Sequence, residues 1–200
     1  MEDLALDPVF NPDKARRLND MSRLETQVGQ ETLARLLDLN GNEDIADLGS
    51  GTGFYTDIVA GFTSGLVYAV EFQPKMNEAY RERGVPPNVR LVEADLRDIP
   101  LRQGSIDVAY SIAVFHEAKG DLGLPNLLPL FRPPGRLVII DWRSDPESWE
   151  SGPPAALRFD KNTVAASLQP YFRRVSAENV GRFMFAVVAA DLAADLVMEA

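Results

Sequence analysis

The segment Asp47-Leu48-Gly49-Ser50-Gly51-Thr52-Gly53 places three glycines and one acid between an apolar stretch and a segment of helical character. Glycine has no Cβ, so such a turn can bend sharply and its backbone can approach a ligand closely. The free N–H groups that open the following helix carry a partial positive charge and attract anionic groups. The turn therefore predicts a ligand site. Its candidate contacts are Asp47, Gly49, Ser50, Gly51 and Gly53.

The spacing of these glycines distinguishes this turn from a dinucleotide-binding turn. A dinucleotide-binding turn reads G-x-G-x-x-G, whereas this turn reads G-x-G-x-G and has Phe54 where the third dinucleotide glycine would stand. The chain also lacks a Tyr-x-x-x-Lys pattern of the kind that dehydrogenases use. Both observations argue against a nicotinamide-dependent dehydrogenase.

Two further acids follow predicted strands. Glu71 ends the strand Leu66 to Val70 and lies 22 residues beyond Gly49, close to the spacing of an acid that binds a ribose. Its carboxylate can accept hydrogen bonds from both ribose hydroxyls. Asp95 follows the strand Val89 to Val92. Because the carboxyl ends of parallel strands form the ligand crevice, we expect both acids to line one site.

Strand-like and helix-like segments alternate over most of the chain, which predicts a parallel sheet covered by helices. A first helix over Glu31 to Leu39 precedes them, with Gly41 as its stop signal. The expected strands are Ile45 to Leu48, Leu66 to Val70, Val89 to Val92, Ile106 to Ile112 and Arg136 to Asp141. The expected helices between them are Phe54 to Gly61, Pro74 to Arg83 and Leu124 to Phe131.

The C-terminal part follows a different pattern. Phe172 to Val175 and Phe183 to Ala189 are two more strand candidates, joined by a short turn around Gly181. Two consecutive strands with a short link predict a hairpin. One of these strands should therefore run antiparallel to the rest of the sheet.

The turn pattern D-x-G-x-G-x-G resembles motif I of the class I S-adenosylmethionine (SAM)-dependent methyltransferases. The segments Gly104 to Ala109 and Arg132 to Leu137 resemble the approaches to the fourth and fifth strands of that family, so that the resemblance covers residues 30–142. Further segments are similar to the ubiquinone/menaquinone C-methyltransferases. They are NPDKARRLND near the N-terminus, Asp141-Trp142-Arg143, and Gly152-Pro153-Pro154 followed by Arg158.

The resemblance implies a Rossmann-like, doubly wound α/β fold with seven mostly parallel strands in the order 3-2-1-4-5-7-6, strand 7 being antiparallel. It implies SAM as the cofactor and in-line transfer of its methyl group to a small-molecule acceptor. Asp95 would accept the adenine amino group, with Leu96 and Phe72 on the two faces of the ring. Ser111, at the end of the fourth strand, is a further expected cofactor contact.

His116 follows the fourth strand and is the only histidine in the chain. In the resembled family this loop borders the transferred methyl group. Two interpretations stay open, a general base that removes an acceptor proton or a residue that only lines the pocket. Four nearby aromatic residues suggest an apolar acceptor pocket, namely Phe54, Tyr55, Phe115 and Trp142. A non-catalytic SAM-binding protein or regulatory partner is the alternative function.

The 200 residues carry a formal net charge of −10 and include no cysteine. Nucleic acid is therefore not an expected substrate, and a metal site is not expected either. The N-terminus lacks the apolar core of a signal peptide and no run of about 18 apolar residues occurs, which predicts a soluble, cytoplasmic protein of undetermined oligomeric state. We expect an extension or cap over 1–30, the methyltransferase domain over 31–190 and a tail over 191–200.

Overall fold

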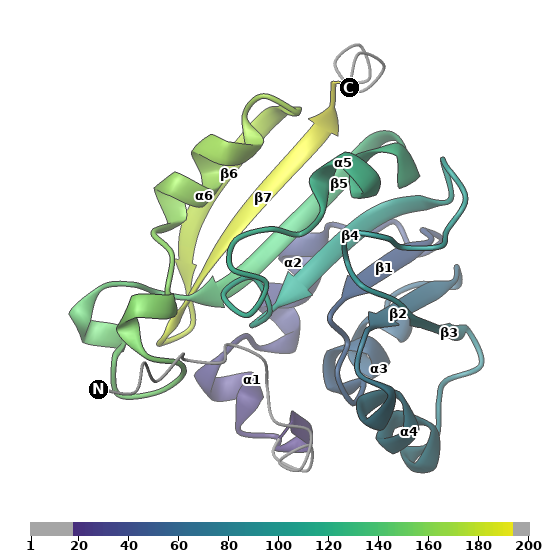
Figure 1. Ribbon diagram of the computed structural model, residues 1–200, viewed down its shortest axis with the longest axis horizontal. Coiled ribbons are helices and arrows are strands. Elements are labelled where there is room, and N and C mark those ends of the chain that lie inside the picture. The colour runs from purple at the N-terminus through teal and green to yellow at the C-terminus, as the bar shows by residue number, and fades with distance from the viewer. Residues whose placement is uncertain (1–17, 194–200) are drawn as a thin grey trace, which may run out of the picture.

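The computed structural model describes residues 18–193, which contain a seven-stranded sheet in the order β3-β2-β1-β4-β5-β7-β6 (Figure 1). The adjacent pairs β3–β2, β2–β1, β1–β4 and β4–β5 are parallel, whereas β7 is antiparallel to β5 and β6. The doubly wound sheet, its strand order and its antiparallel seventh strand are confirmed. The strands are β1 Ile45–Leu48, β2 Val67–Glu71, β3 Val89–Glu93, β4 Ile106–Ile112, β5 Phe131–Trp142, β6 Phe172–Val180 and β7 Met184–Leu192.

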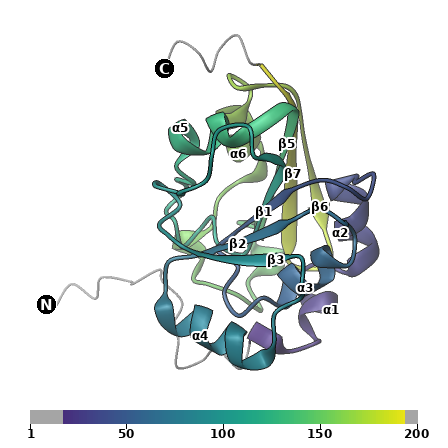
Figure 2. The ribbon, with the colours of Figure 1, turned by 90° about the vertical axis from the view of Figure 1, so that its right-hand side faces the viewer.

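Helices cover both faces of the sheet. Apolar side chains of α2, α3 and α4 join one core cluster with one face of the strands, and those of α5 and α6 join a second cluster on the other face. Figure 2 shows α2 and α6 on opposite sides of the strands. Because both faces are covered, all four residues of β1 are buried. The helices are α2 Gln30–Leu37, α3 Phe54–Ala60, α4 Pro74–Arg83, α5 Leu124–Leu127 and α6 Lys161–Leu168.

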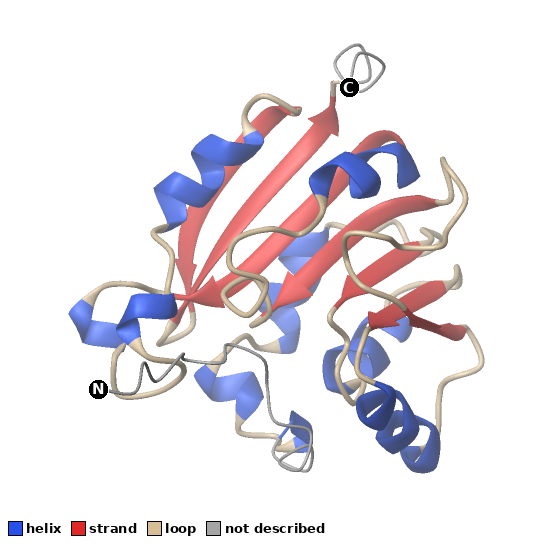
Figure 3. Cartoon of the chain, viewed as in Figure 1, coloured by secondary structure: helices blue, strands red, loops and turns tan. Residues whose placement is uncertain are grey.

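The short helix α1, Arg23–Thr26, belongs to the N-terminal segment that precedes α2. Figure 3 shows this segment below the arrowheads of the central strands, at their carboxyl ends. A segment in this place can contribute to a ligand site, because carboxyl ends of parallel strands face the crevice of such folds.

The C-terminal hairpin turns at Gly181, as predicted. Its φ of +56° is disfavoured for residues with a side chain, and a Cβ there would lie 2.5 Å from the carbonyl oxygen of Gln27. The strands on either side are longer than expected and reach Val180 and Leu192. Glycine is thus required at this position both by the turn and by the N-terminal segment packed against it.

Three helices differ from the sequence-based predictions. The helix expected up to Phe131 ends at Leu127, because Pro129 cannot donate to a helical ladder, and β5 already begins at Phe131. Helix α2 ends at Leu37, capped by a left-handed Asp38, whereas the prediction ran to Leu39 with Gly41 as the stop signal. Helix α6 was not predicted, although its N-cap, Asp160, accepts hydrogen bonds from two amide groups of its first turn.

The division into extension, domain and tail stays a prediction. Residues 1–17 and 194–200 lie outside the described part of the chain, and with them most of the NPDKARRLND segment and of the expected tail. Among residues 18–193, none of the helices has both the length and the apolar character that crossing a membrane requires.

Candidate active site

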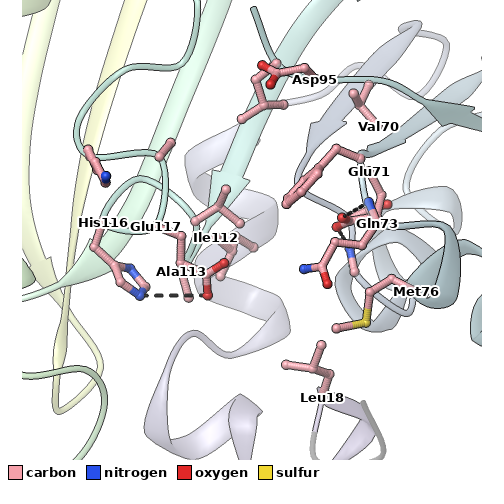
Figure 4. A pocket seen from close by; sticks show the side chains of 18 of the residues that line it. Leu18, Val70, Glu71, Gln73, Met76, Asp95, Ile112, Ala113, His116 and Glu117 are labelled. Atoms are coloured by element: carbon pink, nitrogen blue, oxygen red, sulfur yellow. Dashed lines mark hydrogen bonds and ion pairs between the residues drawn. The ribbon is translucent and has the colours of Figure 1, made fainter. Parts of the chain in front are cut away.

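A cavity of about 520 Å³ opens at the carboxyl ends of β1 to β5. Its walls are the turns that follow these strands, together with parts of the N-terminal segment and of the loop after β5. Figure 4 shows Glu71 and Gln73 on one side of the cavity and His116 with Glu117 on the other. The volume is that of a small-molecule site.

The glycine turn forms the floor of this cavity next to β2. Gly49 and Gly51 have φ values of +79° and +55°, and a Cβ on Gly49 would lie 2.5 Å from the Val114 side chain. The hydroxyl of Ser50 is buried and has no hydrogen-bond partner. A buried hydroxyl without a partner costs free energy, so Ser50 is suited to a polar group of a ligand.

Glu71 connects the turn to the loop after β2. Its Oε2 accepts a hydrogen bond from the Gly51 amide at 3.0 Å, and its Oε1 accepts one from the Gln73 amide at 2.8 Å. Burial raises the pKa of this carboxyl, against the lowering effect of the amide hydrogen bonds. Each oxygen has further lone pairs, which leaves Glu71 able to accept hydrogen bonds from a ligand in the cavity.

Asp95 lines the same cavity together with the neighbouring Leu96 and with Phe72. Arg97 donates to both carboxylate oxygens of Asp95, at 2.8 and 2.5 Å. This pairing lowers the pKa of Asp95 to about 2. Phe72 is 51% exposed and lines the cavity, so its ring is accessible to a ligand there.

Three predicted contacts lie behind the cavity wall instead of on it: Asp47, Gly53 and Ser111. Asp47 is 3% exposed and accepts a hydrogen bond from the Thr56 hydroxyl at 2.6 Å. A Cβ on Gly53 would lie 2.1 Å from the Tyr80 ring, so this glycine is needed for helix packing. Ser111 is fully buried within β4. The sequence-based expectation was that Asp47, Gly53 and Ser111 contact the ligand, whereas none of the three lines the cavity.

The burial of Asp47 predicts a pH dependence of stability that can be tested. Burial raises its pKa from 3.8 to about 6, so the folded state favours the neutral acid and loses stability as pH rises from 3.8 to 6. In Asp47→Asn we expect that loss, at most about 3 kcal/mol, to disappear, while the amide oxygen still accepts from Thr56. Melting temperatures of both proteins between pH 4 and about 7 check this. Parallel pH profiles would contradict it.

The N-terminal segment supplies cavity residues that the sequence did not predict, namely Leu18, Arg23 and Gln27. The Arg23 guanidinium donates to the Leu18 carbonyl at 2.6 Å and to the Gln27 side chain at 3.0 Å. It also stacks over Phe54 and Tyr55, with 5.1 and 4.8 Å to the ring centroids. The sequence offered one indication of this contact, because the aromatic residues directly after the glycine turn can bind a cation on their ring faces.

Of the four aromatic residues expected around the acceptor, only Trp142 lines the cavity. Phe115 is 6% exposed and packs edge-on against Phe159 with 4.9 Å between centroids. Phe54 and Tyr55 pack against each other at 5.0 Å. The apolar wall near Trp142 is instead completed by Gly152 and Pro153 from the loop after β5.

The loop after β4 carries strain and a histidine. Ala113 has a φ of +59°, which costs free energy for a residue with a side chain and often marks a functional site. His116 is 6% exposed, lines the cavity, and has its Nδ1 2.9 Å from Oδ1 of Asp141. Asp141, at the end of β5, was not among the predicted site residues, although an acid ending a strand was the same signal that marked Glu71.

The comparisons with known proteins agree with this geometry. A family model described as a methyltransferase domain matches residues 46–139. A demethylmenaquinone methyltransferase of Clavibacter sepedonicus is 36% identical over 107 residues, 52% of this chain and 43% of that protein. A solved SAM-dependent methyltransferase from Aquifex aeolicus is 28% identical with a TM-score of 0.82, covering 92% of this chain and 100% of that one.

The matched domain and the fold are those of the class I SAM-dependent methyltransferases. SAM is the cofactor of that family of enzymes. The match covers less than half the length of the curated relative. The fold alone is shared with the [4+2]-cyclase SpnF, which is 14% identical with a TM-score of 0.68, over 82% of this chain and 79% of that one.

Proposed function

We propose that this protein transfers the methyl group of SAM to a small-molecule acceptor. The observation that carries the proposal is the meeting of the glycine turn, Glu71, Asp95 and His116 around one cavity. Motif residues on one side would hold the cofactor, and an ionisable residue on the other side would face the acceptor. A quinone-like acceptor is consistent with the name of the Clavibacter relative. A cytoplasmic location stays a prediction.

The cavity residues fit SAM group by group. Glu71 would accept hydrogen bonds from the ribose hydroxyls, and Asp95 would accept one from the adenine amino group between Phe72 and Leu96. The Ser50 hydroxyl, which has no hydrogen-bond partner, and the side-chain-free backbone of Gly51 would face a ligand close to the turn. Asp47, Gly53 and Ser111 would act indirectly, by holding the elements that carry these contacts.

The reaction makes modest demands on the protein. When bound, SAM supplies a methyl group on a sulfonium that leaves as a neutral thioether. The chain's own residues would hold the acceptor in line with that group and exclude water, and such positioning lowers a barrier by roughly 7–11 kcal/mol. Trp142 and Pro153, which line the cavity, would shield the acceptor from water.

Arg23, which lines the cavity next to the glycine turn, would bind the carboxylate of SAM. Arg23→Ala should weaken SAM binding by roughly 10- to 100-fold, because a hydrogen bond to a charged group contributes about 1.5–3 kcal/mol. Binding of methylthioadenosine, which has no carboxylate, should be unchanged. Calorimetric titrations of both ligands check this. Arg35→Ala is the control, since Arg35 forms an exposed ion pair with Glu178 at 2.8 Å. Equal losses for both ligands would contradict a carboxylate contact.

Transfer itself is tested with SAM carrying a tritiated methyl group and a bacterial metabolite extract. We expect label in small molecules with the parent protein and none with Glu71→Ala. SAM binding without any labelled product would contradict the proposed transfer and favour the alternative, a non-catalytic SAM-binding protein.

A further inference from the structure

We propose that His116 and Asp141 act as a proton-accepting pair, and that the acceptor is therefore a hydroxylated molecule that loses its hydroxyl proton during transfer. This inference rests on the proposed function and names its substrate class. In the pair, His116 would be the catalytic base and Asp141 a positioning residue.

The hydrogen bonds of Asp141 determine which imidazole nitrogen carries the proton. Its Oδ1 accepts the Trp142 amide at 2.6 Å and lies 2.9 Å from Nδ1 of His116, and its Oδ2 accepts the His116 amide at 3.2 Å. An ionised carboxylate only accepts hydrogen bonds, so Nδ1 must be the donor. A neutral imidazole has one N–H group, which leaves Nε2 with a lone pair.

The surroundings of His116 favour uptake of a proton. Burial lowers the pKa of the imidazole, but the hydrogen bond and charge of Asp141, together with the charge of Glu117, outweigh burial and raise it. Arg158, from the loop after β5, acts in the lowering direction. Glu117 Oε1 lies 4.0 Å from Nε2 (Figure 4). The two carboxylates therefore stabilise the imidazolium that a base forms.

A base in this place distinguishes between acceptor classes. A hydroxyl oxygen is a poor nucleophile until its proton leaves, whereas a neutral amine attacks with its own lone pair and needs no base beforehand. The hydroxyl proton would pass to Nε2 of His116, and the electron pair that it leaves would form the bond to the methyl carbon. The bond from that carbon to sulfur breaks, and its electron pair stays on the sulfur.

The tautomer and the pKa can be measured without activity. Because His116 is the only histidine, the imidazole signals in nitrogen-15 NMR spectra of the full chain belong to it alone. We expect the neutral form to carry its proton on Nδ1, and Asp141→Asn to lower the pKa. A proton on Nε2, or a pKa that Asp141→Asn leaves unchanged, would overturn the pair.

The labelled products of the metabolite assay test the substrate class. We expect methyl ethers, and His116→Gln should lower their formation by roughly 10²–10⁴-fold with SAM affinity unchanged. The rate should rise with pH through the raised pKa, because the neutral imidazole is the base. Labelled N-methyl amines, or full turnover in His116→Gln, would overturn the inference while the proposed function stands. SAM binding without labelled product would instead be a failure of the proposed function.

Discussion

Gly51→Val should abolish measurable SAM binding while the protein still folds. Gly51 has a φ of +55° and lies on the cavity wall, with its amide bound to Glu71. A β-branched residue in this backbone conformation costs about 1–3 kcal/mol. Its side chain would fill space between the turn and Leu18, whose nearest carbon is 3.3 Å from where the Cβ would lie. We expect the dissociation constant, measured by calorimetry, to rise by at least about 100-fold.

Gly84→Val is the matched control for this substitution. Gly84 has a φ of +97°, no atom lies within 4 Å of its Cβ position, and it follows α4 outside the cavity. Both substitutions put a β-branched residue at a positive φ, so both variants should lose melting temperature, but Gly84→Val should bind SAM normally. Normal binding by Gly51→Val would mean that the glycine turn has only a structural role.

Glu71→Ala should weaken SAM binding by roughly 10²–10⁴-fold. Two charge-assisted hydrogen bonds to ribose hydroxyls would be lost, each contributing about 1.5–3 kcal/mol. Some stability should be lost too, since the amides of Gly51 and Gln73 lose their acceptor. Because burial raises the pKa of Glu71, affinity in the parent protein should fall as the pH is lowered through that value.

Glu93→Ala controls for the loss of an acid at a strand end. Glu93 is the register partner of Glu71 at the end of β3, but it is exposed and outside the cavity. Its replacement should leave SAM affinity unchanged. Affinity that survives in Glu71→Ala, or falls equally in Glu93→Ala, would show that the ribose is held elsewhere.

The sheet and the residues of the candidate site that lie at strand ends could be predicted because their signals are local. Apolar stretches bounded by glycines indicated the strands. The acids Glu71 and Asp95 stand at the ends of two strands whose carboxyl ends lie side by side. Asp47 and Ser111 illustrate the limit. Both are predicted ligand contacts at strand ends, but both are buried and neither lines the cavity.

The remaining site residues depend on contacts between distant parts of the chain. Arg23 lines the cavity only because the N-terminal segment packs over Tyr55, more than thirty residues away. Asp141 becomes a partner of His116 only through the parallel pairing of β4 with β5. Neither contact is visible within a short window of sequence, so His116 and Asp141 could be paired only in the folded chain.

Calorimetric titration of the purified full chain with SAM, and separately with NAD, tests the central claim that this cavity is a SAM site. The structure predicts one SAM per chain with a dissociation constant in the micromolar range, about −8 kcal/mol, and no heat from NAD. Binding of NAD in the absence of SAM binding would contradict it.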